Sequence, residues 1–104
     1  MIDLAIFDEH KLVLEGLTGM LSGISDVRVV LACDDRNVLT NKLKSIQAHV
    51  LILNMHDISV RNLNLIVQLN ISNPKLRILI VSIIDNEEIV LKTIRSEEHT
   101  SELQ

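Results

Sequence analysis

The first 24 residues, MIDLAIFDEHKLVLEGLTGMLSGI, change from one apolar spacing to another, and this change indicates the fold class. Residues 2–7 are apolar at nearly every position, which is typical of a strand that is covered on both faces. After the polar residues 8–11 the apolar residues change to a helical spacing, and Gly23 stands where that helix is expected to end. The stretch therefore predicts a strand followed by a helix. The residues that mark this helix are Val13, Leu17, Met20, Leu21 and Ile24.

This strand–helix unit recurs along the chain. Short aliphatic runs at residues 27–32, 50–53 and 77–83 predict three further strands. The second helix is expected after an aspartate cap at residue 34 or 35, and the third is expected to end before Pro74. Apolar residues at helical spacing mark the two helices, namely Leu39, Leu43 and Ile46 in the second and Leu65, Ile66 and Leu69 in the third.

A fourth helix is predicted at the end of this alternation. Residues 85–88, DNEE, are an acidic relative of the helix capping box, and Ile89, Val90 and Ile94 follow them. The expected element order is then βαβαβαβα. Because crossovers between parallel strands are right-handed, this order predicts an α/β fold with a flavodoxin-like, doubly wound parallel sheet.

The composition favours the same fold and argues against other classes. Seventeen Leu, 14 Ile and 10 Val supply the core of a buried sheet, while 23% charged residues argue against an integral membrane protein. Acidic residues outnumber basic ones 14 to 10 and Phe7 is the only aromatic residue, so this segment is not expected to bind nucleic acid by itself. The single cysteine, Cys33, cannot form an internal disulfide and favours a cytoplasmic location.

The last ten residues, RSEEHTSELQ, differ from everything before them, because Leu103 is their only apolar residue. They match, codon for codon, the in-frame translation of a common sequencing-adapter read. We therefore expect a native domain over residues 1–94 and a non-native tail over residues 95–104, with the junction within a residue or two of Arg95.

Polar residues follow the first and the third predicted strands. Asp8 and Glu9 come after the first strand, and residues 54–57 come at the end of the third. In a flavodoxin-like sheet these two strand ends are neighbours at the point where strand order reverses, and ligands bind there. Two adjacent carboxylates at such a crevice suit Mg²⁺. The alternative is that Asp8 only caps the first helix.

Residues 6–17, IFDEHKLVLEGL, are similar to the start of receiver domains in bacterial two-component response regulators. The pattern is most similar to the branch that carries a helix-turn-helix output domain. The resemblance continues through residues 27–30, 50–54, 73–82 and 85–88, so it covers residues 2–94.

This resemblance implies a domain in phosphorelay signal transduction that regulates transcription and is not itself an enzyme. The implied partners are a sensor kinase or another regulatory protein, and a second copy of the chain in a full-length homodimer. DNA would be contacted only through the output domain, and no membrane is involved. The resemblance also implies that residues 1–94 hold four of five βα units, with the fifth strand, the fifth helix and the output domain missing from this sequence.

By the resemblance, Asp8 and Glu9 occupy the acidic pair that binds Mg²⁺, and Ser82 occupies the position of the hydroxyl that senses the phosphoryl group. Asn54 occupies the phospho-acceptor position, where the family has Asp. An aspartyl phosphate forms when a carboxylate oxygen attacks phosphorus, and a neutral amide is a poor nucleophile. The resemblance therefore implies a pseudo-receiver that has a degenerate acceptor, a weakened Mg²⁺ site and no catalytic residue.

Two alternatives stay open. The loop after the third strand lacks the proline and glycines common in the family, and Asp57 within it is an alternative acceptor for a receiver that still cycles phosphate. A flavodoxin-type cofactor binder has the same topology, but Asp8 and Glu9 would repel the phosphate of its cofactor.

The remaining unusual residues have structural interpretations. Cys33 is expected to be a small core residue, and His10, His49 and His56 show no metal-ligand spacing. Without a fifth strand, residues 77–83 would form an apolar sheet edge, and the chain alone would then aggregate or swap.

Overall fold

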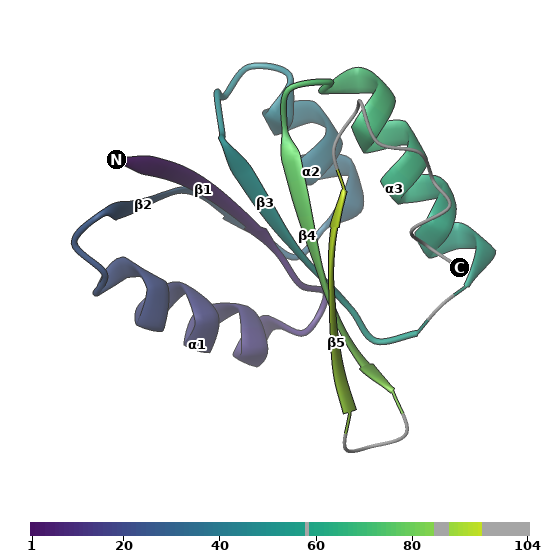
Figure 1. Cartoon of the computed structure of the whole chain (residues 1–104), viewed down its shortest axis with the longest axis horizontal. Helices are drawn as coiled ribbons and strands as arrows, with labels where there is room; N and C mark the ends of the chain where they lie inside the picture. The colour runs from purple at the N-terminus through teal and green to yellow at the C-terminus, as the bar shows by residue number, and fades with distance from the viewer. Residues whose placement is uncertain (58, 85–87, 95–104) are drawn as a thin grey trace.

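Strands and helices alternate along the chain as far as β4 (Figure 1). The computed structural model describes residues 1–57, 59–84 and 88–94. The elements are β1 (Ile2–Phe7), α1 (Lys11–Ser22), β2 (Val27–Cys33), α2 (Arg36–Leu43), β3 (Val50–Met55), α3 (Val60–Ser72), β4 (Arg77–Ile84) and β5 (Glu88–Ile94).

The strands form one sheet with the order β2-β1-β3-β4-β5. The first four strands are parallel, as predicted. This order confirms the flavodoxin-like topology, because strand order reverses at β1 and the next strand on its other side is β3. In the β1–β3 pair, Leu4 lies opposite Val50 and Phe7 lies opposite Leu53. The carboxyl ends of β1 and β3 are therefore level with each other.

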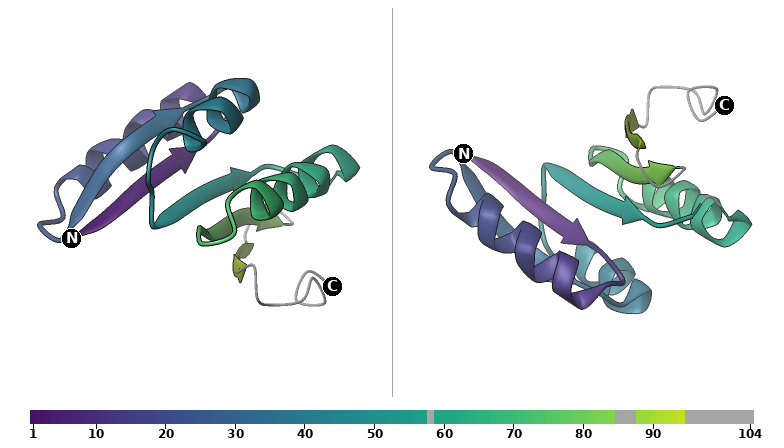
Figure 2. Two further views of the ribbon diagram at one scale, coloured as in Figure 1. Left: turned by 90° about the horizontal axis from the view of Figure 1, so that it is seen from above. Right: turned by 90° about the horizontal axis from the view of Figure 1, so that it is seen from below.

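Residues of β1 alternate between two cores on the two faces of the sheet. Leu4 and Ile6 pack in the smaller core with Leu14 of α1. Ala5 and Phe7 belong to the larger core, which also holds the buried apolar residues of α2 and α3. In agreement, α1 lies on one side of β1 and the α2–α3 pair lies on the other (Figure 1). The strands fan out in the two views of Figure 2, as expected for a twisted sheet.

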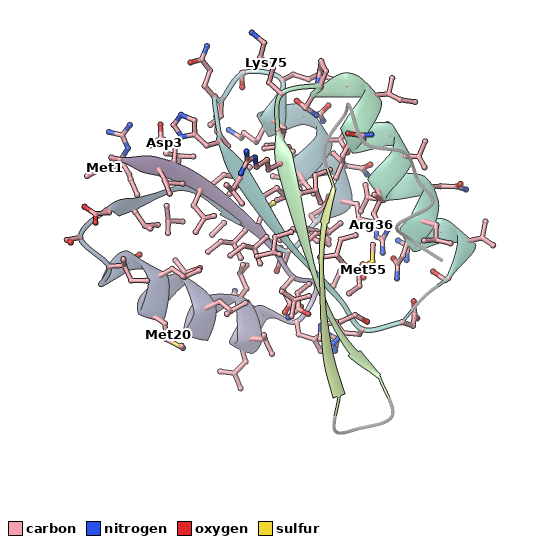
Figure 3. All side chains as sticks on the ribbon, in the orientation of Figure 1. Met1, Asp3, Met20, Arg36, Met55 and Lys75 are labelled. Carbon is pink, nitrogen blue, oxygen red and sulfur yellow. The ribbon has the colours of Figure 1, made fainter. Side chains whose placement is uncertain are left out.

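The buried face of α1 differs from the predicted one. Leu14 is buried and Leu17 and Leu21 are half-buried, whereas Val13 and Met20 are exposed, and Met20 points away from the sheet (Figure 3). The helix is so rich in aliphatic residues that two overlapping stripes have helical spacing, and contact with the sheet decides between them. The helix ends at Gly23, as predicted.

The predictions for α2 and α3 are confirmed, except that α2 ends before Ile46. The Asp35 side chain caps α2 by accepting hydrogen bonds from the backbone N–H groups of Asn37 and Val38. Helix α3 begins after a Ser59 cap and ends at Ser72, before Pro74. The predicted core residues of these helices are buried, namely Leu39, Leu43, Leu65, Ile66 and Leu69. Ile46 lies beyond the end of α2 and is half-buried.

The predicted fourth helix is wrong where the structure describes it. Residues 85–87 and 95–104 lie outside the described residues, but Glu88–Ile94 is a strand that pairs antiparallel with β4. Two causes favour a strand here. Ile89, Val90 and Ile94 are β-branched, and the edge of β4 needs partners for its backbone N–H and C=O groups. The expectation that β4 is a bare sheet edge is therefore also wrong, because β5 covers it.

No helix among the described residues is long and apolar enough to cross a membrane.

Cys33 is expected to resist alkylation in the folded protein. Its side chain is buried, and this burial raises the pKa of the thiol to about 11 from 9.0. The reactive thiolate is then scarce, so labelling by iodoacetamide near pH 8 should be on the order of 100-fold slower than in urea. The contribution of the neutral thiol to stability is present below the ordinary pKa of 9.0 and is lost as pH rises through about 11. Mass spectrometry measures both rates, and equal rates would contradict a buried Cys33.

Candidate functional site

The candidate site lies at the carboxyl ends of β1 and β3. Asp8 directly follows β1, and Asn54 lies near the end of β3. Ser82 lies in the next strand, β4, opposite Met55 of β3. Asp8, Asn54 and Ser82 are three of the four buried polar residues in the part of the chain that the structure describes, and they gather on adjoining strand ends.

Asp8 is completely buried, with an exposed fraction of 0%. Its backbone N–H donates to the carbonyl of Cys33 at 3.3 Å. Its carboxylate Oδ1 accepts a hydrogen bond from the backbone N–H of His10 at 2.8 Å. His10, and not Asp8, is the N-terminal cap residue of α1. The carboxylate therefore shapes the turn into the helix without capping it.

Asn54 makes direct contact with this carboxylate. Its side-chain amide Nδ2 donates to Asp8 Oδ2 at 2.6 Å, across 46 residues of sequence. A carboxylate only accepts hydrogen bonds, so the NH₂ group of the amide is the group that must face it. Asn54 Oδ1 is buried and has no hydrogen-bond partner among the described residues. Asn54, at the predicted acceptor position, and Asp8, a predicted metal ligand, are thus in direct contact through the side-chain amide of Asn54.

Two histidines complete the surroundings of Asp8. His56 Nε2 lies 2.9 Å from Asp8 Oδ1, and His10 Nδ1 lies 3.5 Å from the same oxygen. The two imidazole rings are tilted against each other, with centroids 3.9 Å apart.

The sequence interpretation missed this histidine pair, although a signal for it was present. The β1–β3 pairing joins residues that are 46 apart, such as Phe7 and Leu53. Continued beyond the strands, the same offset matches Asp8 with Asn54 and His10 with His56. A search for polar residues at equal offsets from paired strands would have placed both histidines together.

Glu9 was predicted to bind Mg²⁺ together with Asp8, but its carboxylate pairs with Arg36 instead. Its side chain is 42% exposed, and both of its carboxylate oxygens accept hydrogen bonds from Arg36 at 3.3 Å. Hydrogen bonding to the Arg36 guanidinium lowers the pKa of Glu9 below its usual value. The contribution of this pair to stability is therefore present above the ordinary pKa of 4.5 and is lost as pH falls through the lower value of the folded state.

Asp57 belongs to the network of Arg36 and not to the surroundings of Asp8. Its Oδ1 accepts from the side-chain amide of Asn62 at 2.6 Å, and its backbone carbonyl accepts from the same amide at 2.8 Å. Arg36 in turn donates to Asn62 Oδ1. Asn62 is buried at the start of α3, and sequence reasoning missed its role in holding the loop.

Ser82 is buried in β4, and its hydroxyl oxygen has no hydrogen-bond partner among the described residues. Asn54 Oδ1 and Ser82 Oγ are two of the three orphaned buried side-chain atoms in the described part of the chain. Both lie on adjacent strands at the carboxyl edge of the sheet. Orphaned buried polar atoms are uncommon in folded proteins and point to a functional site.

The donors at this site do not match the preference of Mg²⁺. Mg²⁺ favours oxygen ligands, above all carboxylates. Here a single carboxylate, that of Asp8, is surrounded by an amide and two imidazoles, and Glu9 is paired with Arg36. Asp8, His10 and His56 nevertheless form a group that can hold a metal ion, with ligand atoms that all lie within 4.8 Å of one another.

Comparison with known proteins was informative only at the level of structure. No model of a protein family matches the chain, and no curated protein matches it. The isolated REC domain of RcsB from Salmonella enterica serovar Typhimurium, in the presence of the phosphomimetic BeF₃⁻, has a TM-score of 0.70 and 30% identity, covering 82% of this chain and 64% of that one.

Two structures of RcsB with DNA give similar values. RcsB from the same organism bound to the promoter rprA has a TM-score of 0.70 and 28% identity, covering 83% of this chain and 72% of that one. A structure of two RcsB dimers bound to two parallel DNAs has a TM-score of 0.71 and 30% identity, covering 82% of this chain. This chain spans 44% of that RcsB chain.

The strand order, the site at the carboxyl edge and these similarities identify the chain as a receiver domain of the response-regulator class. Within that class it is similar to RcsB, a regulator solved in complex with DNA. This result agrees with the helix-turn-helix branch that residues 6–17 indicate.

Proposed function

We propose that this domain is a pseudo-receiver, which is a regulatory module that transmits a signal by interaction and not by phosphorylation of its acceptor position. The observation that carries the proposal is the 2.6 Å hydrogen bond from the Asn54 amide to the buried Asp8 carboxylate. At the place where a receiver presents a nucleophilic carboxylate, this chain presents an amide whose nitrogen is already engaged.

The chemistry of phosphoryl transfer supports the proposal. An acceptor must attack phosphorus with an oxygen that carries negative charge, and the amide oxygen of Asn54 is neutral. Mg²⁺ would offset the charge of the incoming group, but we expect it to bind weakly because Glu9 is held by Arg36. Autophosphorylation of a receiver domain thus lacks its nucleophile here, and its Mg²⁺ is expected to bind weakly. The domain is therefore proposed to catalyse no reaction.

The proposed input is the binding of a partner that distinguishes two conformations of the domain. A ligand shifts a conformational equilibrium only by its difference in affinity for the two states. A regulatory protein, a small molecule or a second copy of the chain fulfils this condition, and RcsB offers a precedent because it binds DNA as dimers. The proposed output is control of a DNA-binding domain in the cytoplasm.

The test is incubation with acetyl phosphate and Mg²⁺, followed by intact-mass measurement. We expect no phosphoryl adduct on the native chain. The matched variant Asn54→Asp, which restores the carboxylate, should gain one adduct under the same conditions. This variant also shows that the reagents are active.

A stable adduct on the native chain would overturn the proposal. If Asp57→Asn then removes that adduct, the domain is a phosphorylatable receiver that uses Asp57. The carboxylate of Asp57 is accessible but contacts Asn62 and not Asp8, so this reaction would proceed without the buried carboxylate.

A further inference from the structure

We infer that Asp8, His10 and His56 form a binding site for a divalent transition-metal ion, with Zn²⁺ as its representative. The site uses one carboxylate oxygen and two imidazole nitrogens, and it replaces the all-oxygen site expected for Mg²⁺. The inference rests on the geometry of these three side chains and does not depend on whether Asn54 accepts phosphate.

The distances support a shared metal ion. Tetrahedral zinc with bonds of about 2.0–2.1 Å places its ligand atoms roughly 3.3 Å from one another. Around Asp8 Oδ1, His56 Nε2 lies at 2.9 Å and His10 Nδ1 at 3.5 Å. All three ligand atoms lie within 4.8 Å of one another, and both histidines are exposed.

Burial gives each ligand a suitable position. Asp8 is fully buried and forms the floor of the site, whereas the side chains of His10 and His56 are 61% and 32% exposed. An ion can therefore enter from solvent. Three protein ligands also leave one position of a tetrahedral ion open for water or for a group on a partner.

A hydrogen-bond partner that orients the Asp8 carboxylate is already in place. The Asn54 amide holds Asp8 Oδ2 at 2.6 Å, which orients the carboxylate and leaves Oδ1 directed toward the histidines. Outer hydrogen bonds of this kind fix a ligating carboxylate and raise metal affinity. Asn54 Oδ1, on the same side chain, is buried and has no hydrogen-bond partner among the described residues.

The donor types decide which metals the site prefers. Imidazole nitrogen suits Zn²⁺, Cu²⁺, Ni²⁺ and Co²⁺, whereas Mg²⁺ and Ca²⁺ prefer oxygen ligands. Binding requires the tautomer of His56 that carries its proton on Nδ1, so that the Nε2 lone pair faces the ion. The bound ion would tie the loop after β1 to the loop after β3.

The chain provides its own control, because three histidines lie among the described residues and only two of these, His10 and His56, lie at the site. His49 is exposed near the opposite edge of the sheet, where its Nδ1 accepts a hydrogen bond from the backbone N–H of Asp3. We compare His10→Gln and His56→Gln with His49→Gln, each in the full 104-residue chain.

The experiment is a titration with Zn²⁺ against a chromophoric chelator, and with Co²⁺ followed by visible absorption. We expect one Zn²⁺ per chain, and a visible Co²⁺ band of the intensity that four-coordinate Co²⁺ produces. His10→Gln and His56→Gln should each weaken Zn²⁺ binding at least about tenfold. His49→Gln should leave the affinity unchanged, and a large excess of Mg²⁺ should not displace the ion.

Three outcomes would overturn the inference. The first is no Zn²⁺ binding to the native chain, which would make the three side chains a hydrogen-bonded cluster only. The second is equal weakening by the site variants and the control variant, and the third is displacement by Mg²⁺. Circular dichroism of each variant separates loss of ligand from loss of fold. Phosphodonor reactivity is not used as a readout, so failure here leaves the pseudo-receiver proposal standing.

Discussion

The Asn54→Asp variant is expected to be less stable than the native chain by about 3 kcal/mol at neutral pH without divalent cations. The substitution changes only an NH₂ group into oxygen, but it places a second carboxylate 2.6 Å from the Asp8 carboxylate. Both groups are buried, so water screens their repulsion poorly. The hydrogen bond that now stabilises Asp8 is lost at the same time.

The pH dependence of this loss has a definite sign. Two carboxylates at such a distance hold a shared proton more strongly than isolated carboxyls do, so the folded variant binds more protons than its unfolded state. The stability of the variant therefore falls as pH rises above about 4, and the difference from the native chain shrinks toward lower pH. Millimolar Mg²⁺ should recover part of the loss, because two carboxylates form a better site for a hard cation.

Urea unfolding of both chains, with and without Mg²⁺, measures this prediction. The matched control is Asn64→Asp, which makes the same chemical change at an exposed position of α3. We expect the control to change the free energy of unfolding by less than about 0.5 kcal/mol. An Asn54→Asp variant as stable as the native chain would show that Asp8 and residue 54 do not share a buried site.

Phe7→Ala is expected to lower the free energy of unfolding by about 3–5 kcal/mol. Phe7 is the only aromatic residue of the chain, and its side chain is 2% exposed. It packs in the larger core with Leu51 and Leu53 of the neighbouring strand. Truncation removes its transfer free energy and leaves a cavity that the closely packed sheet cannot fill. Domains of this size have only about 5–15 kcal/mol of stability, so the loss is a large part of the total.

The control for this prediction is Leu12→Ala in α1. Leu12 is 82% exposed, so its truncation should cost no more than about 0.5 kcal/mol. Urea denaturation followed by circular dichroism reports both values. A loss below about 1 kcal/mol for Phe7→Ala would contradict a close-packed core between β1 and α2–α3.

The predictions from sequence succeeded where a local pattern was sufficient. Aliphatic runs placed the first four strands, Asp35 and Ser72 mark helix ends close to those expected, and Asn54 was placed beside Asp8. Other predictions failed where several local solutions compete. The buried face of α1 was misplaced because two neighbouring faces of the helix are both apolar. Residues 88–94 form a strand because the edge of β4 offers partners for their backbone N–H and C=O groups.

The alternation of strands and helices, the burial of the sheet on both faces and the amide at the acceptor position follow from the sequence alone. These features depend on the spacing of residues along the chain. The pairing of Glu9 with Arg36, and the approach of His10 and His56 to Asp8, depend instead on the three-dimensional fold. Those contacts join residues 27 and 48 positions apart. They depend on which strands are neighbours and on their register, and no local pattern specifies either.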